Sequence, residues 1–178
     1  MSLDMEETLR LAVQPTVEKL ERIARGSSRM ARWVLGAIAR GFYEPGYTLS
    51  RLKAALTIND RNLKEVTIEI GIASGQLITE CRMEAAFRLL RDTLLTVDEV
   101  AFLVGYNSRR SFELACRRWC GLPPAELRTC VRREWPRLSS MPEDVFSWHF
   151  AVRHERGELS SADLALVAER IRELQGVS

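Results

Sequence analysis

The spacing of apolar residues indicates helix over the N-terminal part of the chain. Along residues 3–25 apolar side chains recur every three to four positions, which is the period of one face of an amphipathic helix. A second helix is predicted from about 30 to 40, where Gly41 ends the pattern. Pro15 interrupts the first helix and is expected to kink or split it, because proline removes a backbone donor.

From Thr48 onward the pattern occurs twice. The first copy contains Thr48, Leu49, Leu52 and Leu56, and the second, 48 residues later, contains Thr96, Val97, Val100 and Val104. Each threonine suits the N-cap of a short helix, and Thr96 forms a capping box with Glu99. A turn follows each short helix, at 57–59 and 105–108, and another helix follows each turn. This order is that of a helix-turn-helix motif.

A longer helix is predicted between the two copies, at 76–93. At about 1.5 Å per residue it would span roughly 25 Å, a length comparable with one turn of DNA at roughly 34 Å. Pro123 and Pro124 open a further helix that reaches about residue 133. Beyond it, residues 144–152 fit either helix or strand, and a last helix begins near Ser160.

These elements predict an all-α fold, in which tandem helix-turn-helix (homeodomain-like) units are joined by a long linker helix, with extra N- and C-terminal helices. The predicted organisation has three parts. They are an N-terminal amphipathic helix at 1–29, a double helix-turn-helix domain at 30–133 and a mostly helical C-terminal extension at 134–178.

The overall composition says little about function, whereas the local distribution of charge is more informative. Apolar residues make up 46% of the chain and charged residues 28%, values that exclude wholesale disorder. The net charge of +2 is too small to indicate nucleic acid, but residues 107–133 carry seven arginines against two glutamates. The N-terminal ten residues carry three acids, and the longest uncharged apolar run nearby is 33–39. We therefore expect no signal peptide, no membrane span and a cytoplasmic location.

The sequence contains no recognisable catalytic or metal-binding arrangement. The four cysteines form no C-x-x-C pair and are interpreted as buried, reduced thiols. His149 and His154 lie near Trp148 and Phe150, where packing of an aromatic cluster is favoured over a ligand or metal site. Motifs such as G-x-S-x-G, H-E-x-x-H and a glycine-rich phosphate loop do not occur. The prediction is a protein that is not an enzyme and needs no cofactor.

Two segments carry a resemblance to a known family. Residues 100–108 read V-A-F-L-V-G-Y-N-S and are followed by Phe112, Gly121 and Pro124. They are similar to the pattern I-A-x-x-x-G-F-x-S-x-x-x-F, with a later G-x-[ST]-P, of AraC/XylS-type transcription regulators. Residues 82–90 resemble the R-L-x-x-A-x-x-L-L of the same family. The resemblance covers about residues 30–133 and implies a DNA-binding domain with two recognition helices in successive major grooves.

The resemblance also implies which residues contact DNA. Arginine suits guanine, because its planar fork reaches O6 and N7 together. The candidates for reading bases are Arg109, Arg110, Ser111 and Glu113 in the second unit, and Arg61, Lys64 and Glu65 in the first. The candidates for phosphate contacts are Ser108, Arg117, Arg118, Arg128 and Arg82.

The first unit departs from the family pattern. Thr57 stands where the family usually has glycine, and Glu65 where it usually has a basic residue. Residues 60–70 carry a net charge of −1, which is unfavourable beside phosphates. Two hypotheses stay open. The chain is either a bacterial-type regulator that reads DNA mainly with its second unit, or an interaction or scaffold module that keeps the fold with weak or no specific DNA binding.

The expected partners follow from the first hypothesis. Double-stranded DNA is the principal one, and RNA polymerase is a candidate. The apolar stripes of the N-terminal helix and of residues 161–175 also suit a homodimer or a docked partner.

Overall fold

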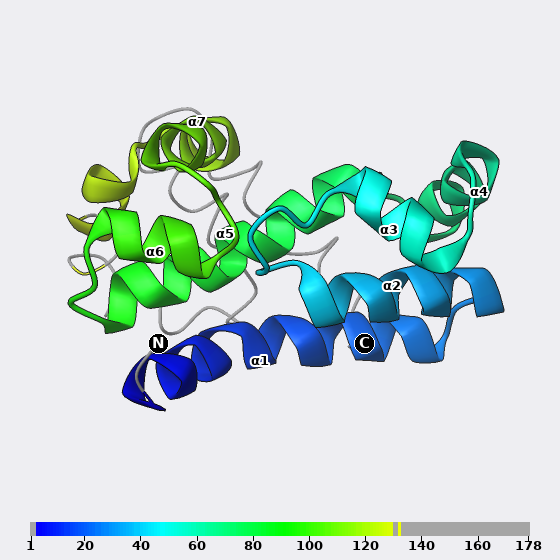
Figure 1. Cartoon of the computed structure of the whole chain (residues 1–178), viewed down its shortest axis with the longest axis horizontal. Coiled ribbons are helices and arrows are strands. Elements are labelled where there is room, and N and C mark those ends of the chain that lie inside the picture. Colours follow the sequence, from blue (N-terminus) through cyan, green and yellow to red (C-terminus); the bar gives the residue numbers. More distant parts are fainter. Residues whose placement is uncertain (1–2, 130–131, 133–178) are drawn as a thin grey trace, which may run out of the picture. The chain divides into compact units, whose positions relative to one another are not determined.

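The computed structural model describes residues 3–129 and residue 132. All regular secondary structure in these residues is helical, which confirms the predicted all-α class (Figure 1). The helices are α1 (Leu3–Arg25), α2 (Arg29–Gly41), α3 (Leu49–Leu56), α4 (Asp60–Ile70), α5 (Ser74–Asp92), α6 (Val97–Leu103) and α7 (Arg109–Cys120). A further helical stretch occupies 124–129. The interpretations of 134–178, including the histidines at 149 and 154, lie outside the described residues.

The chain forms two compact units, residues 1–115 and residues 116–178, and the boundary falls inside α7. The first unit contains α1 to α6 and the first half of α7. The second unit begins with the last turns of α7. Each unit has its own buried side chains, and each is described separately below.

The core of the first unit lies where α1, α2 and α5 pack together (Figure 1). α2 buries five apolar side chains, namely Ala31, Val34, Leu35, Ile38 and Ala39. α5 buries most of its length, with Cys81, Met83, Ala85, Ala86, Phe87, Leu89 and Leu90. α1 adds Ala12, Val13 and Leu20. The apolar stripe that suggested a dimerisation surface on α1 is therefore used within the chain.

α1 continues through Pro15 as one helix and is not split there. Proline at this position removes the bond to the Leu11 carbonyl and crowds that carbonyl, but Val13 before it and Thr16 and Leu20 after it are buried in the core. Packing on both sides of the proline therefore outweighs its local effect on the helix.

A buried polar network also joins α1 to α5. The Glu84 carboxylate is 2% exposed and accepts hydrogen bonds from Thr16 Oγ1 at 2.7 Å and from Lys19 Nζ at 2.7 Å. Arg88 donates to Thr16 Oγ1 at 2.8 Å and to the Ala12 carbonyl at 3.0 Å. A buried carboxylate needs such partners, since desolvation alone would strongly disfavour its charge. The network holds the N-terminal helix in a defined register on the linker helix.

The two helix-turn-helix units are positioned by α5. α3 and α4 lie at the N-terminal end of this helix, and α6 packs against its C-terminal part (Figure 1). α5 has 19 residues, which at about 1.5 Å each gives roughly 28 Å. The predicted N-caps are confirmed, because Thr48 accepts from Arg51 N and Thr96 accepts from Glu99 N, both at 3.2 Å.

Candidate DNA interface

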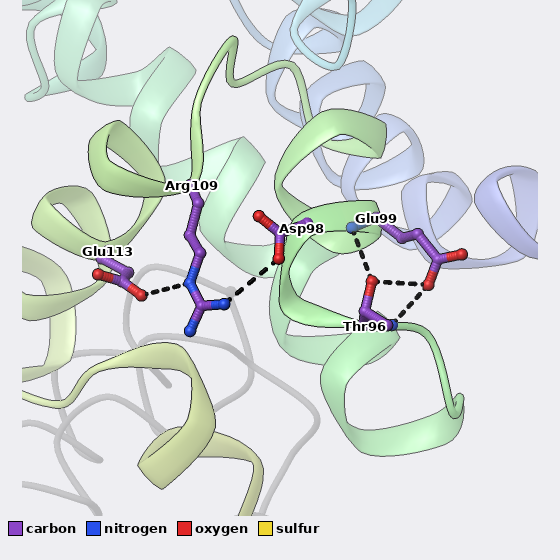
Figure 2. Close-up of polar contacts among 5 residues, drawn as sticks. All are labelled: Thr96, Asp98, Glu99, Arg109 and Glu113. Carbon is purple, nitrogen blue, oxygen red and sulfur yellow. Dashed lines mark hydrogen bonds and ion pairs between the residues drawn. The ribbon is translucent and has the colours of Figure 1, made fainter.

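The capping box of α6 fixes the start of the second helix-turn-helix. Thr96 Oγ1 accepts from the Glu99 backbone N–H, and the Glu99 carboxylate accepts from the Thr96 backbone N–H at 2.6 Å (Figure 2). These hydrogen bonds lower the pKa of Glu99, the backbone N–H of Thr96 being the main cause. Two backbone donors at the helix N-terminus are thereby satisfied, as the sequence predicted.

The turn after α6 depends on Gly105. Its φ of +91° lies in the region that residues with side chains rarely adopt. A Cβ added here would also lie 2.9 Å from the Glu44 carbonyl oxygen and 3.1 Å from Arg82 Nε. Glycine is therefore needed twice, for its backbone conformation and for the close approach of the loop before α3.

Arg82 stabilises this junction from α5. Its Nε donates to the Phe42 carbonyl at 2.7 Å, and its Nη2 donates to the Tyr47 carbonyl at 2.9 Å. The guanidinium also lies 5.3 Å from the centre of the Tyr106 ring. Burial lowers the pKa of Arg82. Because Nε and Nη2 bind the chain's own carbonyls, Arg82 stabilises the fold at this junction, and its predicted phosphate contact stays a prediction.

Ser108 and Phe112 set the position of the second recognition helix, α7. Ser108 Oγ accepts from the Ser111 backbone N–H at 3.2 Å and lies 2.9 Å from Ser111 Oγ. Phe112 is fully buried, with its ring 5.5 Å from that of Tyr106. Ser108, a predicted phosphate contact, thus takes part in capping the helix, while its exposed position leaves room for a phosphate.

Arg109, the first residue of α7, lies between two carboxylates (Figure 2). Its Nε donates to Glu113 Oε1 at 2.7 Å, and its Nη1 donates to Asp98 Oδ2 at 3.3 Å. These contacts raise the pKa of Arg109, mainly through the hydrogen bond to Glu113. The sequence identified Arg109 and Glu113 as base-reading candidates but missed Asp98. The position of Asp98, an acidic residue in the first turn of the helix before α7, was the sequence signal that could have identified it.

Arg110 and Ser111 complete the exposed start of α7. Among the described residues, Arg110 forms no ion pair within 4.0 Å. Its side chain is therefore available to a ligand at the solvent surface. Arginine, serine and glutamate side chains on one exposed helical turn provide both donors and acceptors for base edges.

The second unit carries the remaining basic candidates. Arg117 and Arg118 are exposed in the last turn of α7, while Arg128 is half-buried and its pKa is lowered mainly by that burial. Below them lie the buried side chains of Cys116, Trp119, Cys120, Leu122 and Leu127. The two exposed arginines therefore fit phosphate contacts better than Arg128 does.

In the first helix-turn-helix, α4 is acidic, but its carboxylates have partners. Asp60 accepts from Lys53 Nζ at 2.8 Å, and Glu65 pairs with Arg61 at 3.3 Å. Glu69 accepts from both the backbone N–H and the hydroxyl of Ser28, each at 2.6 Å, and these bonds lower its pKa. Two of the three acids of α4 therefore interact with groups outside this helix.

Exposed basic groups remain on α4. Arg61 is exposed, with a side-chain exposure of 86%, and pairs with Glu65. Lys64 is also exposed and, within the described part of the chain, forms no ion pair. The helix begins at the Asn59–Asn62 capping box and ends at Gly71, whose φ is +77°. The first recognition helix is thus well formed, although it is less basic than the second.

Three of the four cysteines lie in the described residues, and all three are buried free thiols, in agreement with the sequence interpretation. Burial raises the pKa of the Cys81 thiol, which disfavours the reactive thiolate. No cluster of three or more metal-ligating side chains is found in the residues that the structure describes. No helix in that part of the chain is long and apolar enough to span a membrane.

Comparison with known proteins agrees with this geometry. Residues 48–129 match the family model described as "Helix-turn-helix domain". The chain is 32% identical over 94 residues to the HTH-type transcriptional regulator GadX of Escherichia coli O6:H1, an alignment that covers 53% of this chain and 34% of GadX. It is 32% identical over 73 residues to the HTH-type transcriptional regulator VqsM of Pseudomonas aeruginosa, covering 41% and 22%. The chain thus spans about a third or less of these relatives.

Two solved structures of regulators are also similar to this chain. The C-terminal domain of AraT, a response regulator from Geobacillus stearothermophilus, superposes with a TM-score of 0.55 at 29% identity, covering 58% of this chain and 86% of that domain. A DNA-binding transcriptional dual regulator from Escherichia coli K-12 gives a TM-score of 0.50 at 27% identity, covering 60% and 96%. Residues 48–129 are therefore similar in sequence and in fold to the helix-turn-helix domains of these transcription regulators.

Proposed function

We propose that the chain is a transcription regulator that binds specific double-stranded DNA sequences and reads the major groove mainly with α7. The observation that carries the proposal is the start of α7, where Arg109, Arg110 and Ser111 are exposed on a helix fixed by a cap, a glycine turn and the buried Phe112. A rigid support of this kind is what base reading requires, because hydrogen bonds to base edges depend on fixed geometry.

Within this proposal the basic residues have different roles. Arg109 and Arg110 contact guanine, and Ser111 and Glu113 contact neighbouring bases or orient the arginines. Ser108, Arg117 and Arg118 contact phosphates and set the register of α7 on the duplex. Arg128 makes a smaller contribution, because it is less exposed than Arg117 and Arg118.

The first helix-turn-helix contributes less to DNA binding than the second. Arg61 and Lys64 are its available cations, and Glu65 accepts from Arg61 or, on DNA, from the amino group of cytosine. The pairing of Asp60 with Lys53 and of Glu69 with Ser28 reduces the repulsion that the net charge of α4 alone would suggest. We infer that α4 makes a secondary contact in a neighbouring groove and has not lost DNA binding.

The remaining expectations belong to the same proposal. A regulator of this kind works in the cytoplasm, where its DNA lies, and acts through RNA polymerase. It performs no catalysis. A homodimer would place two copies on a repeated site. Of the proposed parts 1–29, 30–133 and 134–178, the last would then be the part left for contacts with partners, because the first packs on the helices of the second.

The test is a binding selection from random duplex DNA at moderate salt. Wild type is expected to enrich a defined motif, and Arg109→Ala/Arg110→Ala is expected to lose it. The matched control is Arg22→Ala/Arg25→Ala, which removes the same charge from the exposed end of α1 and should keep the motif. Weak binding of all sequences that the α7 variant does not change would favour the interaction or scaffold module instead.

A further inference from the structure

We propose that Asp98 and Glu113 determine base specificity without having to touch DNA, by holding the Arg109 guanidinium in the orientation in which it reads one guanine. The inference rests on the proposed DNA-reading function. It adds Asp98, a residue on the helix before the recognition helix, to the residues that set the target sequence.

The geometry of the three side chains supports this role. Arg109 opens α7, Glu113 lies one turn further along the same helix, and Asp98 belongs to the first turn of α6 (Figure 2). Glu113 accepts from Nε at 2.7 Å, and Asp98 accepts from Nη1 at 3.3 Å. Because the two carboxylates come from different helices, the plane of the guanidinium is constrained from two directions.

This arrangement leaves the donors that guanine needs. A guanidinium has five N–H groups, and the two carboxylates use one on Nε and one on Nη1. In the described part of the chain Nη2 forms no hydrogen bond, and Figure 2 shows it pointing away from both carboxylates. Nη2 and the second N–H of Nη1 can therefore bind O6 and N7 together while both carboxylates keep their contacts.

Fold stability does not account for the pairing of these charges. The side chains of Arg109, Asp98 and Glu113 are 52%, 64% and 36% exposed, and ion pairs at such exposure contribute little to folding. The pairing has a clearer effect on DNA binding. It fixes the Arg109 side chain before DNA binds, so that binding costs less side-chain entropy. Arg110, which has no carboxylate within ion-pair distance among the described residues, lacks this constraint.

The first helix-turn-helix shows the opposite arrangement at the same place. Its recognition helix begins with Asp60, which pairs with Lys53 of the preceding helix at 2.8 Å. In both units an ion pair therefore joins the start of the recognition helix to the helix before it. The recognition helix contributes the acid in the first unit and the base in the second. Only the second unit places an oriented arginine at this position.

The experiment repeats the selection with wild type, Arg109→Ala, Asp98→Asn and Glu113→Gln, and measures affinities for the selected duplex and its single-base variants. Arg109→Ala identifies the guanine position, where a bidentate contact supports a preference of roughly 5- to 150-fold. Asp98→Asn is expected to reduce that preference about 3- to 10-fold while raising affinity for all sequences, since a negative charge near phosphates is removed. Adding Asp98→Asn to Arg109→Ala should change the preference no further.

The control is Asp92→Asn, which removes an exposed carboxylate that pairs with Arg91 at the end of α5. It should leave the guanine preference unchanged, and thermal unfolding should show that all variants fold. If Asp98→Asn raises affinity but keeps the preference, Asp98 merely competes with DNA for Arg109 and the inference is overturned. If wild type enriches no motif, the proposed function fails and the inference fails with it. The two failures are thus distinguishable.

Discussion

Thr57 offers a direct test of how the sequence departs from an ideal helix-turn-helix. It is the C-cap of α3 and has φ 53° and ψ 45°, and it is the one residue other than glycine with positive φ in the described chain. Its side chain is exposed, and its backbone N–H bonds to the Ala54 and Lys53 carbonyls. Because threonine branches at Cβ, this left-handed conformation is strained.

Thr57→Gly should stabilise the protein. Removing the Cβ relieves about 1–2 kcal/mol of left-handed strain, while the freedom of glycine in the unfolded chain costs about 0.5–1 kcal/mol. Since the exposed side chain contributes no core packing, the net gain is about 0.5–1 kcal/mol. For a chain of this length the melting temperature should rise by about 1–4 °C.

The assay is thermal and urea unfolding of wild type, Thr57→Gly and Ala55→Gly. Ala55 is exposed inside α3, so glycine there adds the same unfolded-state freedom without relieving strain and should destabilise by about 1 kcal/mol. Thr57→Asn should give a smaller gain, because asparagine tolerates left-handed geometry. A Thr57→Gly variant that unfolds as easily as Ala55→Gly would refute the assignment of strain to Thr57.

Three further outcomes are expected. Gly105→Ala should destabilise by about 2–3 kcal/mol in urea unfolding, because it combines a φ of +91° with a Cβ only 2.9 Å from the Glu44 carbonyl oxygen, and equal stability would contradict that contact. Glu84→Ala should cost about 3 kcal/mol by calorimetry, since it leaves basic side chains at the α1–α5 contact without their carboxylate, and Glu84→Gln should recover part of the loss. The pKa of Glu69 is lowered below its usual 4.5 by Ser28, so its stabilisation is full above that value and is lost as the pH falls through the folded pKa. Glu69→Gln should therefore be less stable than wild type at pH 7 and equal to it in strong acid, and a difference independent of pH would exclude the carboxylate as the cause.

The helices and their caps were predictable because they depend on local chemistry. The period of apolar residues and the capping threonines placed α1, α3, α4 and α6 close to their observed bounds. The effect of Pro15 was less predictable, because continuity of α1 depends on its packing against α2 and against α5, which is distant in sequence. Local signals thus located the elements, while tertiary contacts decided how each element tolerates an unfavourable residue.

The site was predictable in its residue types and less so in its contacts. Arg82 matched a family pattern and was predicted to contact a phosphate, whereas its bonds from Nε and Nη2 to three carbonyls before α3 were not predicted. Asp98 was not predicted as a site residue, because its partner Arg109 lies eleven residues away across the turn. Contacts of this kind depend on the angle between two helices, and that angle follows from Gly105 and the buried Phe112 rather than from spacing.

The contrast between the two recognition helices shows why net charge is a poor guide to a binding surface. α4 has a net charge of −1, yet Asp60 and Glu69 are bound to Lys53 and Ser28 on other elements. On α7, Arg109 counts as one positive charge, yet its guanidinium is held by two carboxylates. Carboxylates near DNA reduce affinity, because they repel phosphates, but they increase selectivity when they orient a donor. A surface built in this way should bind its target less tightly than its arginines suggest and should discriminate between bases more strongly.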